Sequence, residues 1–130
     1  MIHGIILTHG PIGDAMIEAV RCIMGLDEGL HSLIVNNMSV TEISSRLSAL
    51  ILAPEVRQDG VIVMASLKGG SCWNVAVAVA KNHAHVRVIS GVNLSMVLSF
   101  VTKRDSLTLD KLADAVVKDG LRGIMLHVAE

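Results

Sequence analysis

The chain has very few aromatic side chains: its 130 residues include one Trp, one Phe and no Tyr. Its charge is also nearly balanced, with 11 Lys and Arg against 12 Asp and Glu, and the basic residues are scattered along the sequence. A nucleic-acid interface needs a basic patch or aromatic side chains on which bases stack. The composition therefore argues against nucleic-acid binding.

Long apolar runs are missing as well. No run approaches the roughly 20 residues that span a bilayer, and the N-terminus lacks the basic segment and apolar core of a signal peptide. The two cysteines, Cys22 and Cys72, stand alone in hydrophobic surroundings, which is typical of buried thiols rather than of a disulfide. We expect a cytoplasmic protein.

Aliphatic residues are abundant instead, and they bring the hydrophobic fraction to 52%. A chain of this length suits one domain, which we assign to residues 1–130. The aliphatic excess indicates either a sheet that is buried on both faces or a sizeable subunit interface.

The hydrophobic period alternates between that of strands and that of helices. Strands are predicted at residues 4–7, 30–35, 61–65 and 86–89, with a short last strand at 124–128; helices are predicted at 14–24, from Ser39 to a stop at Pro54, and at 71–80, 95–103 and 108–118, with Gly120 and Gly123 breaking the last one. This alternation predicts an α/β fold, with an open, mainly parallel sheet and helices on both faces.

Three strand-to-helix loops should share one rim of such a sheet, because parallel strands all end on the same side. The first loop contains Thr8, His9 and Gly10. The others are residues 66–71, with Ser66, Lys68, Gly69, Gly70 and Ser71, and residues 90–93, which end at Asn93. The rim is the predicted ligand site.

His9 has two interpretations. It is either a loop histidine bonded to backbone or a nucleophile whose neutral imidazole accepts a phosphoryl group. The second loop also has two: Gly69 and Gly70 make a turn and Ser71 caps a helix, or the free N–H groups at that helix start bind a phosphate. Lys68 would either neutralise the phosphate or remain solvated.

The remaining histidines and acids give weaker signals. His83 and His85 form an H-x-H without a Cys, Asp or Glu to complete a metal set, so we expect surface residues. His3, His31 and His127 have no partner that the sequence reveals. No acidic residue ends the first, third or fourth strand, which argues against an aspartyl phosphate and against a paired-carboxylate hydrolase. We expect no metal and no cofactor.

Three motifs carry a resemblance to a known family. They are Ile5-Ile6-Leu7-Thr8-His9-Gly10, then Gly69-Gly70-Ser71 followed by Trp73-Asn74, and Gly91-Val92-Asn93 with Met96 beyond it. Together, and in this order, they resemble the mannose-family IIA domain of the bacterial phosphoenolpyruvate-dependent sugar phosphotransferase system. The similarity runs from about residue 2 to about residue 123.

The resemblance implies a phosphoryl carrier. The phosphocarrier protein HPr would phosphorylate His9, and His9 would pass the group to a IIB component, so the chain would meet the membrane only through transporter components. The family fold has strand order 2-1-3-4. Its members are usually homodimers in which a C-terminal strand, here residues 124–128, can be exchanged onto the partner's sheet edge.

One departure from the family pattern leaves two functions open. Members that transfer phosphate typically have an aspartate where this chain has Ser66, and Leu67 and Lys68 replace a common Thr-Trp. A serine can hydrogen-bond to the ring but adds no charge. Because His9 and the glycine-serine loop are both intact, the chain is predicted to be a working carrier, with His9 as acceptor, Ser66 as its hydrogen-bond partner and residues 69–71 as the anion cradle. The alternative is a regulatory or interaction module that passes no phosphate.

Overall fold

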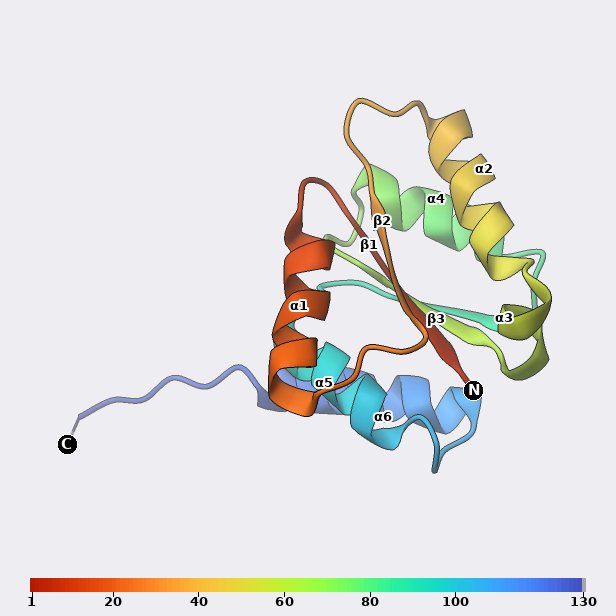
Figure 1. Ribbon diagram of the computed structural model, residues 1–130. Helices are drawn as coiled ribbons and strands as arrows, with labels where there is room; N and C mark the ends of the chain where they lie inside the picture. The colour runs from red at the N-terminus through yellow and green to blue at the C-terminus, as the bar shows by residue number, and fades with distance from the viewer. Residues whose placement is uncertain (130) are drawn as a thin grey trace.

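Four parallel strands form one sheet at the centre of the chain (Figure 1). The computed structural model describes residues 1–129. The strands are β1 (His3–Thr8), β2 (Leu30–Ile34), β3 (Val61–Ala65) and β4 (Val86–Ile89), in the order β2-β1-β3-β4. The helices are α1 (Ile12–Met24), α2 (Val40–Ile51), α3 (Pro54–Asp59), α4 (Ser71–Ala80), α5 (Leu94–Lys103) and α6 (Leu109–Arg122). The predicted fold class and strand order are confirmed.

The two inner strands are buried on both faces because helices cover both sides of the sheet. Every residue of β3 is fully buried, which explains its unbroken apolar run. On one face α2, α3 and α4 pack against Ile5, Leu7 and Val63; on the other α1, α5 and α6 pack against Ile6 and Met64 (Figure 1).

Helix ends follow the local signals of the sequence. The Ser39 hydroxyl accepts a hydrogen bond from the Glu42 N–H at 3.1 Å, which confirms the predicted start of α2. Gly25 ends α1 with a left-handed φ of 73°. Because all four strands run in parallel, their carboxyl ends form one rim, as the prediction required.

Two helix predictions need correction. Pro54 does not only stop one helix: it is also the first residue of α3, a short helix that was not predicted from the sequence. Gly120 does not break α6, which continues to Arg122. A side chain at Gly120 would collide with Met96 of α5, so this glycine permits close packing of the two helices rather than a helix end.

Residues 124–128 form no strand in this single chain and run outward from its body (Figure 1). Four of them are strongly exposed apolar residues: Ile124, Met125, Leu126 and Val128. The strand predicted there requires a second copy, so it stays a prediction. Within the described residues, no helix is both long and apolar enough to cross a bilayer.

Cysteine and histidine placements differ in part from expectation. Cys72 is buried, but Cys22 is exposed on α1. His83 and His85 are half-buried, and His85 Nε2 lies 2.8 Å from the carbonyl oxygen of Ile51. His3 and His31, for which the sequence revealed no partner, contact each other across β1 and β2, with 2.8 Å between His3 Nδ1 and His31 Nε2.

Candidate functional site

His9 lies on the rim, one residue beyond the end of β1. Gly10 follows it with φ at +66°, a left-handed conformation that favours glycine, and α1 begins two residues later. The Gly10 N–H donates to the side-chain oxygen of Asn36 at 3.0 Å, which holds the turn against the end of β2. The imidazole is therefore exposed on a backbone that is fixed on both sides.

Both ring nitrogens of His9 have a partner. Nδ1 lies 3.0 Å from the carbonyl oxygen of Val35, and Nε2 lies 3.1 Å from the hydroxyl oxygen of Ser71. A carbonyl can only accept, so Nδ1 must carry the hydrogen and donate it. In the neutral ring, Nε2 then carries the lone pair and accepts a hydrogen bond from Ser71.

Ser71 does not cap its helix. The N-cap of α4 is Gly70, with extended backbone and no side-chain cap, and Ser71 is the first helical residue. The first backbone bond of the helix runs from the Asn74 N–H to the Gly70 carbonyl, so the N–H groups of the first turn remain open. The positive end of the α4 dipole thus lies beside His9, where it favours an anion.

Gly69 is the residue that makes this approach possible. Its φ is +82°, a conformation that other residues rarely adopt, and its carbonyl accepts from the Asn74 side chain at 3.4 Å. The glycines can therefore make a turn while the N–H groups at the helix start bind an anion, because the turn places the start of α4 next to the imidazole.

A cleft of about 420 Å³ opens beside His9. Its lining residues are His9, Ile12, Met16, Ser66, Leu67 and Val92. Ser66 therefore lies in the same cleft as His9, but among residues 1–129 no hydrogen bond joins the two. Ser66 is therefore not the hydrogen-bond partner of His9 that was expected. The ring contacts the Val35 carbonyl through Nδ1 and the Ser71 hydroxyl through Nε2 instead.

Three other predicted rim residues have different places. Thr8 is fully buried below the rim, and its hydroxyl has no hydrogen-bond partner within residues 1–129. Asn93 caps α5 by accepting from the Met96 N–H at 2.9 Å, and it donates to the Gly120 carbonyl at 3.2 Å. The third loop reaches the His9 cleft through Val92 instead. Lys68 is exposed on its loop.

The contribution of β2 to the site was not predicted from the sequence. Val35 and Asn36 follow β2, the neighbour of β1 in the sheet, and both hold the His9 turn. The strand order implied by the resemblance was the signal that could have found them, because it places the carboxyl end of β2 against that of β1.

Other chemistry near the rim is limited. Burial raises the pKa of the Cys72 thiol, so this cysteine, next to Ser71, stays protonated and is a poor nucleophile. In the described part of the chain, no three His, Cys, Asp or Glu side chains come together in a way that could hold a metal ion. The arrangement offers one exposed nucleophilic nitrogen, a hydroxyl and a helix start, which together suit transfer of an anionic group.

Comparison with known proteins identifies the class. The family model described as "EIIA-man: PTS system fructose IIA component" matches residues 4–117. The chain is 31% identical over 112 residues to the sorbose-specific EIIA component of the phosphotransferase system (PTS) of Klebsiella pneumoniae, covering 86% of this chain and 82% of that protein. It is 24% identical to the mannose-specific EIIAB component of Escherichia coli K12, covering 92% of this chain and 38% of that longer protein.

A solved structure agrees in fold over nearly the whole chain. The EIIA component of the phosphotransferase system from Streptococcus agalactiae superposes with a TM-score of 0.88 at 27% identity, covering 96% of both chains. The chain belongs to the mannose-type IIA family of the PTS. It is thus a phosphotransferase component, of a class that carries phosphoryl groups in sugar uptake together with a phosphocarrier protein and a IIB partner.

Proposed function

We propose that His9 is the phosphoryl acceptor of this component, that phosphorylated HPr is the donor, and that a IIB component receives the group. The observation that carries the proposal is the pair of contacts on the imidazole. The Val35 carbonyl holds the hydrogen on Nδ1, so the Nε2 lone pair is directed toward Ser71 and the open start of α4.

The transfer step follows from this geometry. The bond between phosphorus and the donor's imidazole nitrogen breaks, and the electron pair stays on the donor. A bond forms between phosphorus and Nε2 of His9, which makes the ring of His9 an imidazolium. The Val35 carbonyl stabilises its Nδ1–H, while the Ser71 hydroxyl turns to donate to a phosphoryl oxygen beside the α4 N–H groups. In transfer to IIB the bond between phosphorus and Nε2 breaks, its electron pair returns to the ring of His9, and phosphorus bonds to the acceptor atom of IIB.

Val35 thereby supplies part of what a carboxylate would supply at the position of Ser66. A carbonyl oxygen fixes the same tautomer and carries a partial negative charge that favours the cationic ring. It lacks a full charge, so it repels an incoming phosphoryl group less. We infer that replacement of the usual aspartate by Ser66 changes the rate of transfer without abolishing it.

The surface around His9 suits a protein partner. Ile12 and Leu67 line the cleft and are 48% and 70% exposed. Exposed apolar side chains around a reactive group provide a docking surface that excludes water during transfer. We infer that HPr and IIB bind here in turn, in the cytoplasm.

Intact-mass spectrometry tests the proposal. The protein is incubated with phosphoenolpyruvate, enzyme I and HPr, and it is kept from acid, which cleaves phosphohistidine. One phosphoryl group is expected on the wild type and on the histidine control His83→Gln, and none on His9→Ala. Phosphorylation of His9→Ala would show that another residue is the acceptor.

The same experiment distinguishes the carrier from the second candidate function. A regulatory or interaction module is favoured by one observation, the absence of the usual carboxylate at Ser66. If the wild type accepts no phosphoryl group while a known carrier in the same mixture does, the carrier proposal fails and the module is supported.

We also propose a homodimer in which residues 124–128 of one copy extend the sheet of the other at β4. β4 is an edge strand, and a groove of about 240 Å³ beside it is lined by residues that include Ile89, Val117 and Ile124. Deleting residues 124–130 should convert the dimer into a monomer in light scattering coupled to size exclusion. A dimer that survives the deletion would refute strand exchange.

A further inference from the structure

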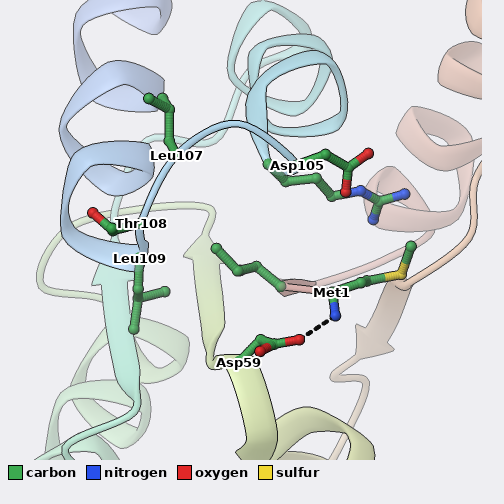
Figure 2. Close-up of a pocket in the computed structure, with 8 residues that line it drawn as sticks. Met1, Asp59, Asp105, Leu107, Thr108 and Leu109 are labelled. Carbon is green, nitrogen blue, oxygen red and sulfur yellow. Dashed lines mark hydrogen bonds and ion pairs between the residues drawn. The ribbon is translucent and has the colours of Figure 1, made fainter.

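A second cavity, of about 360 Å³, lies at the end of the sheet opposite to His9. Figure 2 shows its two sides: Met1 and Asp59, which precede β1 and β3, and the segment from Asp105 to Leu109, which connects α5 to the first residue of α6. No residue of this cavity takes part in the phosphoryl-transfer site.

Arg104 lines this cavity and is only 5% exposed. Its Nε and Nη1 atoms are enclosed and have no hydrogen-bond partner within residues 1–129. Its guanidinium carbon lies 5.5 Å from the centre of the Phe100 ring, a cation–π contact that offsets only part of the lost hydration. A guanidinium is permanently charged and carries five N–H donors, so its burial normally requires an acceptor.

The neighbouring carboxylates do not supply that acceptor. Asp59 is engaged by the amino group of Met1, as the dashed line in Figure 2 marks. Asp105 is exposed, and the ion pairs of the described residues include none between it and Arg104. The cavity also adjoins the start of α6, where Thr108 is the N-cap and no side chain caps the helix. Both features favour an anion.

We propose that this cavity binds a small organic monocarboxylate, with Arg104 as its charged partner. The planar fork of a guanidinium matches the two oxygens of a carboxylate. Ile2, Leu107 and Leu109 provide an aliphatic lining for a short carbon chain. A phosphate dianion is less suitable, because Asp59 and Asp105 would repel its second charge.

The side chain of Met1 is the movable part of the enclosure. A Cβ placed on Gly29 would lie 2.9 Å both from Nη1 of Arg104 and from the sulfur of Met1, so the two side chains meet over this glycine. Met1 is 41% exposed, and a methionine changes rotamer easily. Its displacement opens the guanidinium to a ligand at the cost of little packing.

Titration of the ¹⁵N-labelled chain with sodium butyrate, at constant ionic strength set by chloride, tests the proposal by NMR. Saturable shifts are expected at the Arg104 Nε–H and at the amides of Leu107 and Leu109. Arg104→Gln should bind butyrate at least about tenfold more weakly, which corresponds to roughly 1.4 kcal/mol. Arg122→Gln, which removes an exposed arginine of α6, should leave the affinity unchanged.

A second pair of variants protects the test against loss of the fold in Arg104→Gln. Aspartate and asparagine are both good N-cap residues, so Thr108→Asp and Thr108→Asn should both fold. Only Thr108→Asp adds a negative charge at the cavity, and it should weaken butyrate binding. His9→Ala should bind butyrate as the wild type does, since this site is independent of the proposed carrier function.

Three results would overturn the proposal. The first is a wild type that shows no saturable shift with butyrate. The second is equal affinity in the wild type, Arg104→Gln and Thr108→Asp, which would place the ligand elsewhere. The third is a parallel titration in which inorganic phosphate binds more tightly than butyrate, which would refute the carboxylate class.

Discussion

Replacing Ser71 by alanine separates two opposed effects of one hydroxyl. In the free protein this hydroxyl occupies the lone pair of His9 Nε2 at 3.1 Å, and the bond must break before phosphorus is attacked. During transfer the same hydroxyl would donate to a phosphoryl oxygen. The variant therefore frees the nucleophile and also removes a donor from the transition state.

The magnitudes of these two effects decide whether the rate of phosphoryl acceptance rises or falls. A hydrogen bond between neutral groups contributes about 0.5–1.5 kcal/mol, and one to a charged group about 1.5–3 kcal/mol. The net loss in the transition state is about 1–1.5 kcal/mol, so Ser71→Ala should accept phosphate roughly 5- to 10-fold more slowly. The free energy of unfolding should fall by no more than about 0.5–1.5 kcal/mol, the contribution of the hydrogen bond to His9, because this hydroxyl does not also cap α4.

Rapid-quench kinetics with ³²P-labelled phospho-HPr and an alkaline quench would measure the rate. Ser45→Ala, which removes an exposed serine of α2, is the matched control and should react like the wild type. A Ser71→Ala variant that reacts as fast as the wild type, or faster, would refute the assignment of this hydroxyl to the phosphoryl group.

Three further predictions concern the cleft, the sheet and the core. Ser66→Asp should speed phosphoryl transfer in the same assay, because the carboxylate would stabilise the cationic ring; an equal or lower rate would mean that the site is adapted to serine. The pKa values of His3 and His31 are both lowered, mainly by burial, so near pH 6.5 the folded state binds fewer protons than the unfolded state. The free energy of unfolding should therefore fall as the pH drops from 7.5 to 5.5 in urea titrations, and less so in His31→Gln; equal slopes would contradict this. Leu112→Ala should lose about 2–5 kcal/mol, because Leu112 is fully buried, whereas Leu121→Ala on the exposed side of α6 should lose little.

Most of the fold could be predicted because burial leaves a clear trace in the sequence. Strands covered on both faces need unbroken aliphatic runs, and α4 begins and ends where the apolar pattern placed it. The helix errors have a common cause. Pro54 and Gly120 were treated as residues that end a helix. Proline is also favoured at a helix start, and Gly120 is needed because a side chain there would collide with Met96 of another helix.

The site was predictable only where residue type carries the chemistry. His9 and Ser71 could be selected as a nucleophile and a donor, and the structure places them in contact. The partner of Nδ1 is a backbone carbonyl, which every residue possesses, so no sequence pattern marks Val35. Asn93 shows the opposite error. Its side chain was a candidate for the site because it lies on the correct rim, but both its amide oxygen and its amide nitrogen form structural hydrogen bonds, to the Met96 N–H and the Gly120 carbonyl.

The strand order also affects how the chain assembles during synthesis. β1 is made first, yet it lies between β2 and β3 and needs both as hydrogen-bonding neighbours. The second neighbour is complete only when Ala65 has been added, roughly 3–11 s later at about 5–20 residues per second. During that interval the apolar N-terminal strand has no complete sheet to join. Pairing of β1 on both of its sides therefore waits until the third strand has been made.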